Sequence, residues 1–179
     1  MAKSKSRKKY VPKPVVADTF GLVSKKFAVE AANRRYEAAG KVPISETVSL
    51  RILNLVYLAL ASLKTGKGTV TDWDTVAHAL NMSELLATEL KIGYDYLSTI
   101  RRGQQAHNNC GARYITKSAF GYSGPEMKAM NLALEVHDQQ LEIATVEELE
   151  ALADKIDQKI LAKEIDLYAA KGIVELEDL

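Results

Sequence analysis

The pattern of apolar and polar positions along the chain is that of amphipathic helices separated by short polar turns. In the segment 45–64, apolar residues such as Val48 and Ile52 recur at the three- and four-residue spacing of one helical face. A second apolar face, which includes Leu53 and Leu60, makes this helix apolar nearly all round, which is typical of a helix at the centre of a bundle. We therefore expect its central apolar residues to be buried, namely Leu53, Leu55, Val56 and Leu60.

Other segments show the same periodicity together with signals for where a helix begins or ends. A helix is predicted over 24–39, where Gly40 ends it, and another over 71–102, in two pieces separated by a break at 81–83. Three pairs of residues have the spacing of a capping box, in which two side chains satisfy the first backbone N–H groups of a helix. These pairs are Thr71 with Asp74, Ser123 with Glu126, and Thr145 with Glu148.

These elements predict an all-α fold, a helical bundle of five or six helices. Residues 21–179 form a single domain, and residues 1–20 precede it as a flexible basic arm. Strand-like alternation is confined to 113–120, within an irregular basic excursion near 107–123 that is rich in Gly, Asn and Gln. A loop of that length in a compact domain is usually functional or disordered.

Charge is distributed very unevenly, although the net charge of the whole chain is only +1. Residues 1–41 carry eleven Lys or Arg and three acids, whereas residues 124–179 carry five Lys and fourteen acids. The basic start is too polar to fold alone and is suited to phosphates or an acidic partner, although a merely solubilising tail is the alternative. Its basic residues up to the second proline are Lys3, Lys5, Arg7, Lys8, Lys9 and Lys13.

A second candidate for binding lies between residues 96 and 124, where basic residues occur without any acid. Cations that hold phosphates, together with aromatic rings that stack on bases, are the side chains that single-stranded nucleic acid or RNA requires. The alternative is an ordered loop whose aromatic rings pack on the bundle. The candidate residues are Arg101, Arg102, Arg113, Tyr114, Lys117, Phe120 and Tyr122.

The other chemical signals are weak. A helix-turn-helix over 72–90 has the wrong charge for DNA, because its second helix begins with two acids and no cation. His137 lies on an apolar stripe and is interpreted as a core residue, while Cys110, in the predicted loop, is interpreted as exposed without being marked as a nucleophile. We therefore predict no enzyme activity, no cofactor and no metal site.

Composition indicates a soluble, cytoplasmic protein. The single cysteine cannot form an internal disulfide, which suits a reducing compartment. The basic start is not followed by the apolar run of a signal peptide. The most apolar stretch, 52–63, is short for a bilayer span, so no membrane partner is predicted.

Four segments resemble small helical proteins of tailed-phage and prophage genomes: Tyr10–Val15, Ile100–Gly103, Glu126–Asn131 and Glu135–Leu141. The resemblance implies a viral accessory protein acting in a bacterial host, without assigning a role to any residue. The leading hypothesis is a non-enzymatic protein that binds nucleic acid or a host macromolecule through the arm and the basic, aromatic excursion. An inhibitor of a bacterial host protein and a small virion or assembly component are the alternatives.

Overall fold

The computed structural model describes residues 42–161, and 81% of this described part is helical, with no strand. The prediction of an all-α fold is therefore confirmed. The basic arm, the segment predicted as a helix over 24–39 and residues 162–179 lie outside the described residues. The helices are α2 (Glu46–Lys64), α3 (Val70–Glu89), α4 (Leu97–Lys117), α5 (Gly124–Leu141) and α6 (Val146–Leu161), with a short 3₁₀ helix, η1 (Tyr94–Tyr96), before α4.

Helix α2 begins and ends where the sequence predicts. Ser45 is its N-cap, and its hydroxyl oxygen accepts a hydrogen bond from the backbone N–H of Val48 at 3.3 Å. The chain leaves the helix at Thr65, and Gly66 adopts a left-handed φ of 74° that a residue with a Cβ rarely takes.

Helix α3 differs from the prediction at its start and in its middle. Its capping box is Thr69 with Asp72, not Thr71 with Asp74, and the helix runs without a break through 81–83. Ser83 does not start a new helix, because its buried hydroxyl donates to Gln140 Oε1 on α5 at 2.6 Å. The chain turns instead at Lys91 and Gly93, which both have positive φ. The segment 72–90 therefore does not form the helix-turn-helix that its charge already disfavoured.

The irregular excursion predicted near 107–123 is mostly helix, since α4 continues to Lys117 and only residues 118–123 join it to α5. Of the polar residues that suggested a loop, His107 and Asn109 are buried in helical contacts, whereas Asn108 is exposed. Gly103 permits close packing: a Cβ at this position would lie 2.4 Å from the Cβ of Ala133 on α5. Tertiary contacts therefore override the weak helix propensity of this segment.

Helices α5 and α6 have the predicted start signals. Ser123 and Glu126 form a full capping box, and the side chains of Thr145 and Glu148 accept from each other's backbone N–H groups at 3.4 and 3.0 Å. The start of α6 is also tied to the segment before α2, because Val146 N–H donates to Val42 O at 3.1 Å.

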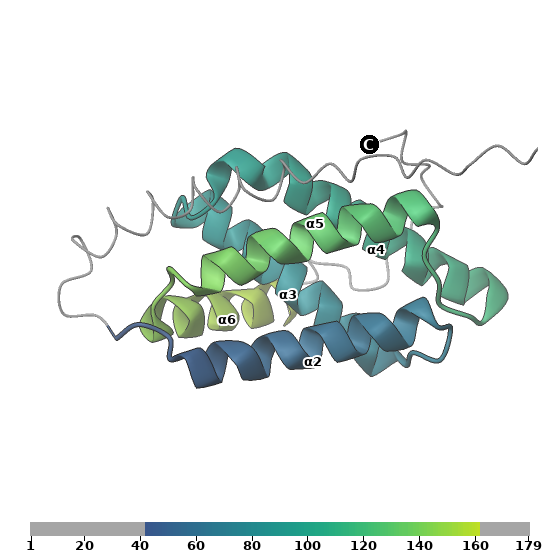
Figure 1. Ribbon diagram of the computed structural model, residues 1–179, viewed down its shortest axis with the longest axis horizontal. Helices are drawn as coiled ribbons and strands as arrows, with labels where there is room; N and C mark the ends of the chain where they lie inside the picture. The colour runs from purple at the N-terminus through teal and green to yellow at the C-terminus, as the bar shows by residue number, and fades with distance from the viewer. Residues whose placement is uncertain (1–41, 162–179) are drawn as a thin grey trace, which may run out of the picture.

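In the bundle, α4 and α5 are antiparallel neighbours, α3 packs against both, and α2 and α6 flank α3 (Figure 1). Buried side chains form two clusters. The first joins α2 to the middle of α3, α4 and α5, around Leu63, Leu80 and Met130. The second joins the end of α3 to α6, around Leu86, Ile100 and Ile156.

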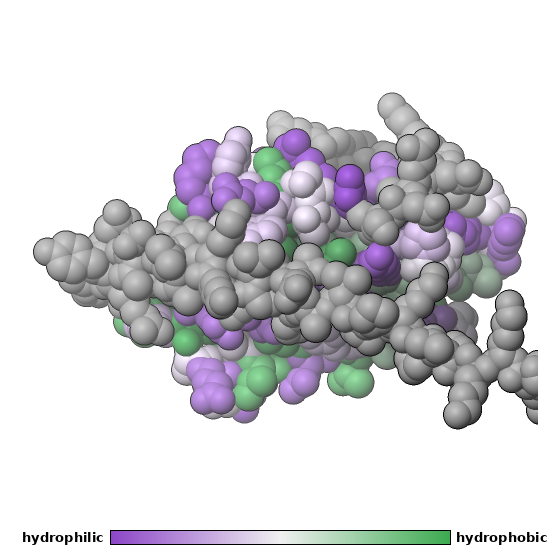
Figure 2. All heavy atoms as spheres, turned by 45° about the horizontal axis from the view of Figure 1, so that its top comes forward, coloured by the Kyte–Doolittle hydropathy of each residue, from purple (hydrophilic) through white to green (hydrophobic). Residues whose placement is uncertain are grey.

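Helix α2 is not the central helix that its composition suggested. It lies at the edge of the bundle and buries only one face, of Val56, Ala59, Leu60 and Leu63. Leu55, expected to be buried, is 64% exposed, and Leu58 is 67% exposed. Figure 2 shows hydrophobic side chains among hydrophilic ones along the lower edge of the molecule, where α2 runs in Figure 1.

The same composition makes α2 the one helix of the described residues that is long and apolar enough to cross a membrane. A single helix of this kind is weak support for a membrane span, because helices of water-soluble proteins have similar length and composition. Here α2 packs along α3 and contributes four buried side chains to the core that it shares with α3, α4 and α5.

Candidate functional site

The predicted aromatic and basic residues of the excursion gather where α4 ends and α5 begins. Tyr114, in the last turn of α4, stacks on Phe120 with ring centroids 4.2 Å apart and planes only 5° from parallel. Phe120 is buried in the core, whereas Tyr114 is 39% exposed. Of this pair, Tyr114 therefore presents an accessible ring, and the buried ring of Phe120 packs against its other face.

Arg113 is held by internal contacts. Its Nη2 donates to Glu126 Oε1 at 2.7 Å, and its Nη1 donates to the carbonyl oxygen of Gly121 at 3.0 Å. Glu126 is only 3% exposed and also accepts from Ser123 N–H at 2.7 Å and from Asn109 Nδ2 at 2.9 Å. Burial opposes ionisation of Glu126, but these hydrogen bonds outweigh it and lower its pKa. Arg113 thus closes the connection between α4 and α5, and Glu126 offsets its charge.

Tyr122 belongs to a buried polar chain with His107 and Trp73. His107 Nε2 lies 2.9 Å from the carbonyl oxygen of Trp73, which only accepts, so Nε2 carries the proton. The other ring nitrogen, Nδ1, then accepts from the Tyr122 hydroxyl at 2.7 Å. Burial lowers the pKa of His107 to about 4 and also raises the pKa of Tyr122, so both side chains are neutral near pH 7.

Cys110 is buried, contrary to the expectation of an exposed thiol in a loop. Its sulfur accepts from the backbone N–H of Gly121 at 3.4 Å. Burial raises the pKa of the Cys110 thiol despite nearby Arg113, so the reactive thiolate form is disfavoured. Cys110 therefore packs in the core, and its environment does not activate the thiol as a nucleophile.

The structure separates the predicted cations of α4 into two groups. Arg101 and Arg102 lie near its start and Lys117 at its end, which is roughly 24 Å along the helix at 1.5 Å per residue. Arg101 Nε donates to Glu84 Oε1 of α3 at 2.9 Å, whereas Arg102 and Lys117 are exposed. The six cations of the arm lie outside the described residues.

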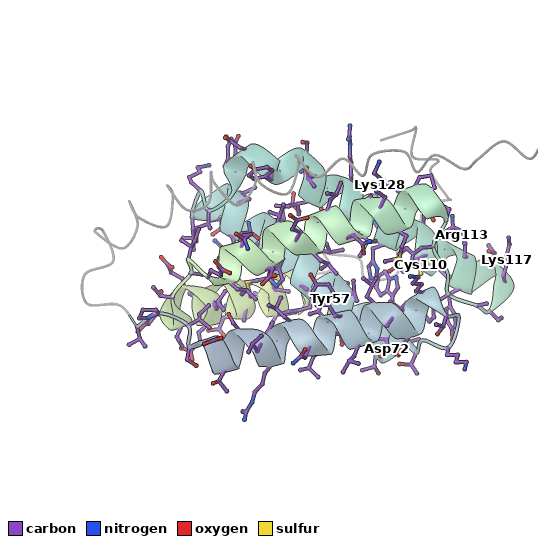
Figure 3. All side chains as sticks on the ribbon, in the orientation of Figure 1. Tyr57, Asp72, Cys110, Arg113, Lys117 and Lys128 are labelled. Carbon is purple, nitrogen blue, oxygen red and sulfur yellow. The ribbon has the colours of Figure 1, made fainter. Side chains whose placement is uncertain are left out.

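Other cations join Lys117 that the sequence analysis did not single out. The turn between α2 and α3 packs against the connection between α4 and α5, since a Cβ on Gly66 would lie 3.7 Å from the carbonyl oxygen of Phe120. Figure 3 shows Arg113, Lys117 and Lys128 at this same end of the bundle. We call this surface the basic end, and its cations are Lys64, Lys67, Arg113, Lys117 and Lys128. Only tertiary packing brings α2 to this surface, so no local sequence signal marks Lys64 and Lys67.

Acidic residues lie mainly elsewhere, although Asp72, in the first turn of α3, is at the basic end and accepts from Thr69 N–H. Helix α6 carries five of the fifteen acids among residues 42–161, with Glu147 and Glu148 in its first turn, and one of its two cations, Lys155, is paired with Glu89 of α3. The uneven charge of the sequence is therefore also uneven in space, with the basic end on one side and α6 on another (Figure 1). No group of three His, Cys, Asp or Glu in the described part of the chain is placed to hold a metal ion.

No family model, curated protein or solved structure matches this chain.

Proposed function

We propose that the protein is a non-enzymatic phage accessory protein that binds nucleic acid through the basic end, together with the basic N-terminal arm. The observation that carries the proposal is that exposed cations of α2, α4 and α5 lie at the same end of the bundle as the exposed ring of Tyr114. Lys64, Lys67, Lys117 and Lys128 are exposed, while the nearby acid Glu126 is buried under Arg113.

The chemistry of this surface suits a phosphate backbone. Lysine ammonium groups on three helices can follow successive phosphates, and a stacked, rigid Tyr114 offers a ring for an unpaired base. The acidic side chains of α6 repel phosphates, so the nucleic acid is directed to the basic end.

The test is a salt titration of the full chain against a labelled duplex, a single strand and an RNA. Each neutralised phosphate releases condensed counterions. A plot of the logarithm of the binding constant against the logarithm of the salt concentration should therefore have a negative slope, of about 0.9 per phosphate contact on a duplex and about 0.7 on a single strand. A variant with Lys67→Gln and Lys117→Gln should bind more weakly and with a shallower slope. The matched control changes two exposed cations away from the basic end, Arg51→Gln and Arg102→Gln, and should keep the slope.

A variant of Tyr114 tests which of the three nucleic acids is bound by base stacking. Tyr114→Ala should weaken binding of the single strand by roughly 1–3 kcal/mol, the contribution of one stacked base, and should leave duplex binding nearly unchanged. The absence of binding to any of the three at low salt, or equal losses in the basic-end and control variants, would reject the nucleic-acid proposal.

An inhibitor of a bacterial host protein is the second candidate, and the exposed apolar residues of α2 favour it. Leu50, Leu55 and Leu58 are each more than half exposed, and Tyr57 is 41% exposed. Aromatic and aliphatic anchors of this kind carry most of the binding energy in protein interfaces. A partner that co-purifies after nuclease treatment and is lost from a Leu55→Lys, Leu58→Lys variant would support this candidate in place of the first.

A further inference from the structure

An apolar cleft opens on the side of the bundle away from the connection between α4 and α5. Helices α2 and α6 form its two sides, and α3 and α5 contribute its inner wall. Its volume is about 590 Å³, within the roughly 300–1,000 Å³ of small-molecule sites. The apolar part of the lining comes mainly from Ile52, Leu55, Val56, Ala79, Leu141 and Leu149.

Two polar atoms of residues that line this cleft are buried without any hydrogen-bond partner among the described residues. They are Nδ1 of His137, on α5, and Oδ1 of Asp74, on α3. His137 is only 1% exposed, so protein encloses nearly all of its ring. Buried polar groups are nearly always paired, and an orphaned pair in the wall of one cleft marks a place where a ligand can supply the missing hydrogen bonds.

The charged residues of the lining define the ligand further. Asp74 and Glu150 are its acids, His78 and His137 its histidines, and it contains neither Lys nor Arg. A carboxylate oxygen accepts hydrogen bonds, and a neutral imidazole can accept one at the nitrogen that carries no proton. An anionic head group would find no cation in this cleft, whereas a hydroxyl or amino group would find acceptors.

We propose that this cleft binds a small amphiphilic molecule with an aliphatic body against α2 and α6. Its polar head is either an amino group that donates to both Asp74 and His137, or a hydroxyl that donates to Asp74 and accepts from His137 when Nδ1 carries the ring proton. The aliphatic body matches the apolar lining, and the head satisfies the two orphaned atoms. This site is separate from the basic end and does not depend on the proposed nucleic-acid function.

The ionisation of His137 fits this arrangement. Burial, and then the neighbouring charge of His78, lower the pKa of His137 to about 4, so its ring is neutral near pH 7. Burial also raises the pKa of Asp74. A neutral imidazole ring has one nitrogen without a proton, which can accept a hydrogen bond, whereas both nitrogens of an imidazolium carry protons.

The test uses the full chain and three probes with the same ten-carbon body, decanol, decylamine and decanoate, each below its aggregation concentration. Isothermal titration calorimetry should show saturable binding of decanol or decylamine and at least tenfold weaker binding of decanoate. The difference between the two favoured heads then identifies the ligand class as alcohol or amine.

Two variants locate the binding. Ala153→Phe places a ring in the cleft from α6 and should weaken binding at least tenfold, whereas Ala151→Phe, on the same helix but outside this cleft, should not. His137→Leu removes one orphaned polar atom, so we expect an equal or higher melting temperature together with a loss of the preference between heads. Melting curves of all variants show that each remains folded.

Three outcomes would overturn the proposal. The first is no saturable binding of decanol or decylamine up to their solubility. The second is binding that Ala153→Phe and Ala151→Phe reduce equally, which indicates attachment to another apolar surface such as the exposed face of α2. The third is a preference for decanoate, which contradicts the charge argument.

Discussion

Several side chains of the segment predicted as a loop are buried in the bundle. His107, Asn109 and Cys110 are each buried, and each has a hydrogen-bond partner on another element. Trp73 and His107 exchange two hydrogen bonds across 34 residues of sequence and stack with ring centroids 4.6 Å apart. These polar residues satisfy each other inside the bundle, so they stabilise α4 as a helix rather than interrupting it.

Buried neutral histidines make the stability of the protein depend on pH. His107 and His137 have a pKa of about 4 in the folded state, against about 6.5 when unfolded. The unfolded chain therefore binds more protons between these values, so the free energy of unfolding is greatest above pH 6.5 and falls as the pH drops toward 4. Together the two groups should lower it by several kcal/mol, on the order of 3 kcal/mol each.

Urea unfolding at pH 7.5, 5.5 and 4.5 measures this loss. Between pH 7.5 and 8.5, well above the unfolded pKa, the contribution of the two histidines should be nearly constant, which serves as the internal control. An unfolding free energy that is unchanged between pH 7.5 and 4.5 would show that neither imidazole is buried in its neutral form. Protonation of Glu126 adds a further loss only at lower pH, because its pKa lies below the ordinary carboxyl value.

At the scale of the elements, helix α2 illustrates how far composition and burial can differ. The helix has apolar residues on nearly every side, yet a bundle of this size covers only the face that meets α3 and α5. Val56, Leu60 and Leu63 lie on that face, and Leu55 and Leu58 lie off it. Leu55 also lines the apolar cleft, and the uncovered residues of α2 form the surface that favours a protein partner.

Two leucines of α2 provide a matched pair for stability. Leu60 is 4% exposed, so Leu60→Ala should lower the free energy of unfolding by roughly 2–5 kcal/mol through lost burial and a cavity. Leu55 is 64% exposed, so Leu55→Ala should change it by less than about 0.5 kcal/mol. Urea unfolding of both variants and the parent chain measures the difference. Equal effects would mean that α2 packs through a different face.

Across the whole molecule, cations and acids are separated in space, as they are separated along the sequence. The basic end draws cations from α2, α4 and α5, and the acids of α6 lie apart from them. The six cations of the arm precede this bundle in sequence and would add to the same positive potential if nucleic acid binds. The whole-molecule arrangement therefore supports one strongly oriented encounter with a polyanion.

Deletion of residues 2–14 tests how much of this encounter the arm supplies. The segment has few apolar residues, so its loss should leave the melting temperature of the bundle unchanged. Nucleic-acid affinity and its salt slope should both fall, because fewer phosphates are neutralised. Circular dichroism melting and a salt titration are the measurements. An unchanged slope would place all phosphate contacts on the basic end.

Local interactions explain which features could be predicted. The caps at Ser45, Ser123 and Thr145 and the stop at Gly66 depend on residues three or four apart, and the structure has them where the sequence indicates. The prediction was wrong for the loop near 107–123, because Gly and Asn lower helix propensity by amounts that tertiary burial easily exceeds. For the candidate site, the exposed Tyr114 and Lys117 could be identified, and the alternative that aromatic rings pack on the bundle holds for Phe120 and Tyr122. No local pattern indicated that Arg113 pairs with Glu126.

The sequence by itself determined the helical class, most helix starts and the separation of positive from negative charge, because periodicity, caps and charge are properties of neighbouring residues. Only the tertiary structure decided which face of α2 is buried, that Glu126 pairs with Arg113, and that Lys64 lies at the same end as Lys117. It also decided that His137 lies in the wall of a cleft with an orphaned nitrogen. These features depend on contacts between distant segments, whose free energies arise from burial and pairing in the folded bundle and leave no local pattern in the chain.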